Sequence, residues 1–150
     1  MRLMKNAFVL SLVLGTLSAQ ATVCFSRTYS GGHLARHSAQ KTKSMVVRLE
    51  SGRAQMIMTQ RSSVTEYLGS LSYCEFANEN AANFNTVCTN DYALWTAGKY
   101  SVLMAVKGNE MKLRVTKPVS FCSDAECVDQ AKLKPKSADS VFILSKVACE

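Results

Sequence analysis

The chain has 150 residues, of which 47% are hydrophobic and 19% are charged, and 18 Lys and Arg against 11 Asp and Glu give it a net charge of +7. This balance is typical of a folded globular protein, because disordered chains combine fewer apolar residues with more charge. The length is sufficient for one domain with a modest core. Seven Gly and two Pro exclude collagen-like and Pro-rich architectures.

The first 21 residues have the pattern of a secretory signal peptide. Arg2 and Lys5 precede an uncharged run at 7–17, and a small-x-small sequence follows at 19–21. The run is too short to cross a bilayer, which needs about 20 apolar residues. We therefore predict cleavage after Ala21, leaving a single β-rich domain at 22–150 that is periplasmic or secreted and has no membrane span.

Residues 32–38 are predicted to form a short helix with both histidines of the chain. His33 and His37 are spaced i, i+4, so they would share one face of that helix. Two such rings can ligate a metal, but Leu34 stands where a metalloprotease has its catalytic Glu, and we predict neither a metal nor a cofactor. We predict instead a binding surface beside the Gly-Gly turn, formed by Arg27, His33, Arg36 and His37.

Much of the remaining chain alternates apolar and polar side chains with a period of two, as β-strands do. The alternation is clearest in 100–116, where Gly108 and Asn109 interrupt it and predict a β-hairpin. Further runs of this kind are 44–50, 53–60, 67–73, 119–122 and 141–145. About eight strands predict a mainly β fold, a small antiparallel barrel or sandwich, with a second short helix at 124–133.

All six cysteines follow the predicted cleavage site. An even number in a small exported chain indicates disulfides that staple the domain. Six thiols allow 15 pairings, of which we favour Cys24–Cys149, Cys74–Cys88 and Cys122–Cys127; the first would close a very long loop. Zinc binding is the alternative, but the chain has no C-x2-C pair, the spacing typical of zinc sites.

The charges are distributed unevenly along the chain. Residues 22–61 have seven basic side chains and one acidic side chain, whereas residues 62–98 have four acidic side chains and no Lys or Arg. This asymmetry can steer an anionic partner onto the first segment; the alternative is that Lys and Arg only occupy the solvent face of the strands. No RNP-type aromatic motif or Gly-x-x-Gly clamp accompanies them, so we do not expect nucleic acid as the partner.

Trp95 is the single tryptophan of the chain and has Tyr92 and Tyr100 close to it in sequence. Aromatic side chains bury large areas, so the first expectation is a place in the core. If Trp95 is exposed instead, it is a candidate hot spot, and we include it among the predicted binding residues.

Two motifs resemble those of a family of small exported bacterial proteins that are β-rich and contain disulfides. A Cys-x-x-Arg-x-Tyr element begins at Cys24, and a His-Leu-x-x-His-Pro-x-Gln element begins at His33, with Ser38 in place of the family's Pro. A Val-Phe-x-Leu segment at 141–144, followed by Cys149, extends the resemblance to the other end of the chain. The resemblance implies fold and compartment, not an activity. A looser likeness is to periplasmic lysozyme inhibitors, whose Ser-Gly-x-x-Tyr loop this sequence does not reproduce.

The sequence thus predicts an exported soluble binding protein of the bacterial envelope, with an envelope protein or an anionic glycan as its partner. We do not expect catalysis, since the chain has no Gly-x-Ser-x-Gly elbow of the kind that presents a catalytic serine. Two alternatives stay open, a periplasmic lysozyme inhibitor and a carrier that holds a small apolar ligand inside a lipocalin-like barrel.

Overall fold

The computed structural model describes residues 22–76 and 85–150, and the predicted signal peptide at 1–21 lies outside these ranges. The helices are α1 (Gly31–Arg36) and α2 (Tyr92–Thr96). The strands are β1 (Val23–Thr28), β2 (Thr42–Glu50), β3 (Arg53–Gln60), β4 (Glu66–Leu71), β5 (Tyr73–Phe76), β6 (Thr86–Thr89), β7 (Val102–Lys107), β8 (Glu110–Val115), β9 (Val119–Cys122), β10 (Gln130–Leu133) and β11 (Val141–Val147). The mainly β prediction is confirmed, but the described residues form eleven strands, more than the eight expected.

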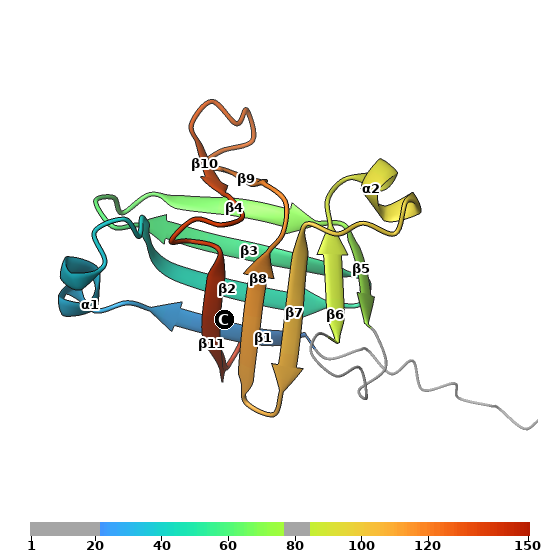
Figure 1. The fold of residues 1–150 in the computed structure, drawn as a ribbon, viewed down its shortest axis with the longest axis horizontal. Coiled ribbons are helices and arrows are strands. Elements are labelled where there is room, and N and C mark those ends of the chain that lie inside the picture. The colour runs from blue at the N-terminus through green and yellow to red at the C-terminus, as the bar shows by residue number, and fades with distance from the viewer. Residues whose placement is uncertain (1–21, 77–84) are drawn as a thin grey trace, which may run out of the picture.

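The strands form one antiparallel sheet in the order β10-β9-β4-β3-β2-β1-β11-β8-β7-β6-β5. Figure 1 shows β1 to β4 running across the molecule while β11, β8, β7 and β6 cross them. We expected a small antiparallel barrel or sandwich; the antiparallel sheet is confirmed, but it curls into a half-barrel and does not close. Its edges, β5 and β10, are four residues each and are not paired with each other in the described structure.

One apolar core fills the inside of the curled sheet. In most strands alternate side chains are buried, as the alternation predicts; in β8, for example, Met111, Leu113 and Val115 are buried and the residues between them are exposed. All five methionines of residues 22–150 are buried, which suits a flexible side chain that fills irregular interiors. The largest fully buried side chains are Phe25, Phe121, Phe142, Met45, Met56, Met58, Leu71, Met104, Met111, Leu113, Leu133 and Leu144.

The turns confirm one local prediction and overturn another. β7 and β8 form the predicted hairpin around Gly108, whose φ of 59° is readily adopted by glycine. The helix expected at 124–133 is wrong. Cys127 has a φ of 56°, which interrupts a right-handed helix, and the end of this segment is β10, paired with β9. Val128, in the middle of this segment, is 85% exposed.

Three disulfides join the same pairs that the sequence analysis favours. Cys24–Cys149 ties β1 to the last residues across a separation of 125, Cys74–Cys88 links directly opposed residues of β5 and β6, and Cys122–Cys127 closes the short loop after β9. Such bridges are compatible with an extracellular or otherwise oxidising environment. Neither helix in the described ranges has the length and apolar character needed to cross a membrane.

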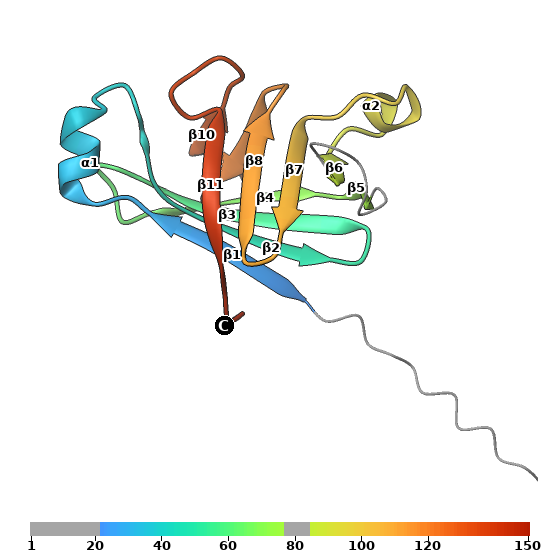
Figure 2. The same ribbon diagram turned by 60° about the horizontal axis from the view of Figure 1, so that its bottom comes forward.

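The helices lie at opposite ends of the molecule. Figures 1 and 2 are related by a rotation about the long axis, and both place α1 at one end of that axis and α2 at the other. We call these the basic end and the aromatic end, for the side chains described below. The predicted binding residues are therefore divided between two distant surfaces, with Arg27, His33, Arg36 and His37 at one and Trp95 at the other.

Candidate functional site

The basic end carries a stack of one guanidinium and three rings, which we call the α1 cluster: Arg27, Tyr29, His33 and His37. The Arg27 Cζ lies 5.3 Å from the centre of the Tyr29 ring. The ring centres of Tyr29 and His33 are 4.7 Å apart, and those of His33 and His37 are 4.2 Å apart. The i, i+4 spacing brings the imidazoles of His33, in α1, and His37, its C-cap residue, onto one side of the helix, as the sequence predicts. Arg27 lies near the end of β1 and Tyr29 directly follows that strand.

Polar contacts fix the helix that supports this stack. The hydroxyl of Ser30 caps α1 by accepting a hydrogen bond from the His33 backbone N–H at 3.1 Å. Gln40, which is buried, donates from Nε2 to the Thr42 carbonyl at 2.9 Å, so its Oε1 accepts from His33 Nε2 at 3.0 Å. The ring of His33 is therefore held by stacking on both faces and by a hydrogen bond at its edge.

Arg61, which directly follows β3, holds the last turn of α1 and the chain that follows it. Its guanidinium donates to the carbonyls of Leu34 at 2.6 Å, Ser38 at 3.1 Å and Gln40 at 3.1 Å, with a longer bond to His37 at 3.3 Å. A positive charge at the C-terminal end of a helix is favoured because the last carbonyls have no partner within the helix. The sequence analysis did not single out Arg61, because its partners are up to 27 residues away and no local pattern marks them.

Asp139, which precedes β11, binds the segment between α1 and β2. Its carboxylate accepts from the backbone N–H groups of Lys41 at 2.9 Å and Thr42 at 3.1 Å, and it is only 8% exposed. These bonds join the turn before β11 to the beginning of β2. Sequence reasoning also missed Asp139, which lies 98 residues from Lys41.

Burial and two nearby charges shift the pKa of Tyr29. Burial raises the pKa of its phenol above the ordinary value of 10.0, because it disfavours the charged phenolate; Arg27 lowers the pKa and Asp139 raises it. Tyr29 therefore stays protonated and neutral up to strongly alkaline pH, and it serves as a ring on which the Arg27 guanidinium rests.

The outer surface of the basic end presents positive charge to solvent. Arg27, Arg36, Lys41 and Lys43 are all exposed, whereas the carboxylate of Asp139 is buried and engaged by backbone donors. The described residues contain no group of three or more His, Cys, Asp or Glu side chains arranged to hold a metal ion. The chemistry that the surface offers is recognition of anions by guanidinium and ammonium groups.

Trp95 belongs to a second group of rings, which we call the aromatic cluster: Tyr73, Tyr92, Trp95 and Tyr100. Trp95 lies with its ring centre 6.1 Å from those of Tyr73 and Tyr100, and Tyr73 lies 5.6 Å from Tyr92. Trp95 is partly exposed and stands outside the buried core, so the first expectation for this residue is corrected. The short helix α2 stands off the end of the sheet (Figure 1), and none of its residues is buried.

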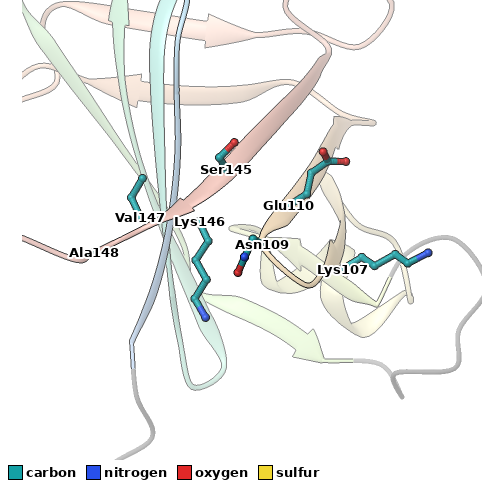
Figure 3. Close-up of a pocket in the computed structure, with 7 residues that line it drawn as sticks. All are labelled: Lys107, Asn109, Glu110, Ser145, Lys146, Val147 and Ala148. Carbon is teal, nitrogen blue, oxygen red and sulfur yellow. The ribbon is translucent and has the colours of Figure 1, made fainter.

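A surface hollow also lies beside the β7–β8 hairpin, lined by Lys107, Asn109, Glu110, Ser145, Lys146, Val147 and Ala148 (Figure 3). The side chains of Lys107 and Lys146 point in different directions and do not converge on one position. The hollow is open, and it gathers no set of groups comparable to the α1 cluster.

Searches of the chain against protein-family models, curated proteins and solved structures find no match.

Proposed function

We propose that the protein is an exported binding protein without catalytic activity, and that its basic end holds an anionic partner, either an acidic glycan or an acidic surface of an envelope protein. The observation that carries this proposal is the α1 cluster with its surrounding exposed cations. Arg27, a member of the cluster, and Arg36, Lys41 and Lys43 are exposed, and the backbone from α1 to the start of β2 is held by hydrogen bonds to Arg61 and Asp139. The Arg27 guanidinium rests on the Tyr29 ring, so it loses less side-chain freedom when it binds an anion.

Two features of the rest of the molecule support an exported protein with a surface site. The inward positions of the curled sheet are filled by packed apolar side chains, which gives the lipocalin-like carrier little support. The three disulfides fasten the scaffold in a way that suits an oxidising compartment. A rigid shell with a charged end is the form expected of a binding module.

The test uses charge reversal with a matched control. We expect the mature protein to bind immobilised heparin, polygalacturonate or poly-glutamate at low ionic strength, and not neutral dextran. Arg36→Glu combined with Lys43→Glu is expected to weaken binding about tenfold or more, and added salt to weaken it further. The control pair is Lys107→Glu with Lys146→Glu, which changes the net charge equally but lies at the hairpin hollow (Figure 3).

Equal weakening by both pairs would mean that only net charge matters, and it would overturn the assignment of the site. Failure of the unmodified protein to bind any of the three acidic polymers would overturn the proposed class of partner. A lysozyme turnover assay decides the remaining alternative: inhibition at micromolar protein that both pairs leave unchanged would favour an inhibitor acting through another surface.

A further inference from the structure

The aromatic cluster is a surface feature with no role in the core. Tyr92 is 64% exposed, and Tyr73, Trp95 and Tyr100 are partly exposed. None of the four belongs to the buried cluster that fills the curled sheet. Burial in the core therefore does not explain why these rings are gathered at one place.

The rings are held on a fixed support. Asp91 caps α2 through Oδ1, which accepts from the backbone N–H groups of Ala93 at 2.8 Å and Leu94 at 3.4 Å. The Lys99 N–H donates to the Leu94 carbonyl at 2.8 Å and closes the other end of the helix. The residue after Tyr73, Cys74, forms a disulfide with Cys88 that joins β5 to β6. A ligand would thus meet rings that are already positioned, which lowers the entropic cost of binding.

The charges beside the rings are mixed, so they give no preference for an anion. Asp91 and Glu75, both exposed, lie on the elements that carry the rings, whereas Lys99, also exposed, directly precedes Tyr100. A protein partner generally needs about 800 Å² on each side, and of the exposed large apolar side chains in the described ranges only Tyr92 belongs to this cluster. The surface suits a small, flat and uncharged ligand unit.

We propose that the aromatic cluster binds a neutral pyranose unit of a glycan, at a site separate from the basic end. One face of a pyranose carries C–H bonds with partial positive charge, and the face of an aromatic ring is negative, so the two stack. The exposed carboxylates of Asp91 and Glu75 are acceptors for the sugar hydroxyls at the rim. Tyr92, the most exposed ring, is the principal stacking surface, and Tyr73 lies next to both Tyr92 and Trp95.

Trp95 provides its own probe, because it is the only tryptophan in the chain. We expect tetrasaccharides of glucose or N-acetylglucosamine to change its fluorescence with a saturable dependence on concentration. Tyr92→Ala is expected to weaken the affinity about tenfold, whereas Tyr92→Phe, which keeps the ring face, is expected to stay within about twofold of the unmodified protein. Ile143→Ala removes another exposed large apolar side chain, on β11, and is expected to leave the affinity unchanged.

Three results would overturn the proposal. The first is no change in Trp95 emission with any neutral tetrasaccharide at millimolar concentration. The second is an equal loss of affinity for the sugar in Tyr92→Ala and Ile143→Ala. The third is an emission change with tri-lysine alone, which would identify a cationic protein partner. Thermal unfolding of each variant shows that the fold is intact. The site is independent of the proposed function: Tyr92→Ala should keep heparin binding, and Arg36→Glu with Lys43→Glu should keep sugar binding.

Discussion

The two ends of the molecule each carry a short helix and a group of rings, but they are fastened differently. At the basic end, Arg61 and Asp139 bind backbone carbonyls and N–H groups from distant parts of the chain. At the aromatic end, a disulfide joins β5 to β6 and the side chain of Asp91 caps α2. The basic end thus depends on charged hydrogen bonds within the fold, and the aromatic end on a covalent link and a local cap. The two surfaces can therefore be disturbed one at a time.

Among the changes that act on one end only, removing the disulfide of the aromatic end is expected to lower the stability most. Cys74→Ser with Cys88→Ser opens a loop with a sequence separation of 14, and we expect a loss of about 3 kcal/mol in the free energy of unfolding. Trp95 emission should shift, because β5 and Tyr73 are no longer locked to β6. Urea unfolding and fluorescence measure both effects.

The matched control for this disulfide is Cys122→Ser with Cys127→Ser, whose sequence separation is only 5. The shorter loop predicts a smaller loss, about 2 kcal/mol, and no change in Trp95 emission before unfolding. An equal emission change in both double variants would contradict the view that Cys74–Cys88 specifically supports the aromatic end.

The counterpart at the basic end is Asp139→Ala. Two backbone N–H groups, those of Lys41 and Thr42, lose their acceptor at a position where the carboxylate is almost fully buried. We expect a loss of about 2 kcal/mol and faster amide hydrogen exchange at the beginning of β2. Unchanged exchange there, or faster exchange around α2 instead, would show that Asp139 does not act on the basic end.

Local sequence patterns predicted which segments form strands better than they predicted which strands pair with each other. The alternating run at 67–73 was expected to be one strand, but it divides at Ser72, with β4 next to β3 and β5 at the far edge beside β6. Alternation tells which side chains face the core, not which strand pairs with which. Likewise, the residues at 124–133 have apolar side chains at a helical spacing, but the adjacent disulfide and the positive φ of Cys127 direct that segment into β10.

The candidate site was predictable to the extent that it is local. His33 and His37 meet because they are one helical turn apart, and Arg27 and Tyr29 are two residues apart in the chain. The residues that fix the site, Arg61 and Asp139, act through partners that are distant in sequence. Such contacts arise only when the sheet has curled, and nothing in the neighbouring residues signals them.

A smaller effect is expected from Asp91→Ala, which removes the cap of α2. Two backbone N–H groups lose their side-chain acceptor at an exposed helix end, for which about 1 kcal/mol is typical. Trp95 emission should move toward that of a solvated indole while the basic end keeps its heparin binding. Asp91→Asn, which retains a capping oxygen, should keep most of the stability; equal loss in both variants would contradict the capping role.

The smallest effect concerns alkaline pH and the tyrosines outside the aromatic end. The pKa of Tyr29 is raised mainly by burial, and the pKa of Tyr67 is raised mainly because its hydroxyl donates to Asp129 Oδ2 at 2.8 Å. A phenol whose pKa is higher in the folded state favours folding fully below its unfolded pKa of about 10, and this contribution is lost as the pH rises through the folded value. Stability should therefore fall with pH above about 10, and Tyr29→Phe should flatten part of that decline. Urea unfolding between about pH 9 and 11.5 measures how steeply the stability falls with pH in Tyr29→Phe, in Tyr67→Phe and in the variant that combines both. An unchanged slope in the combined variant would show that neither phenol contributes.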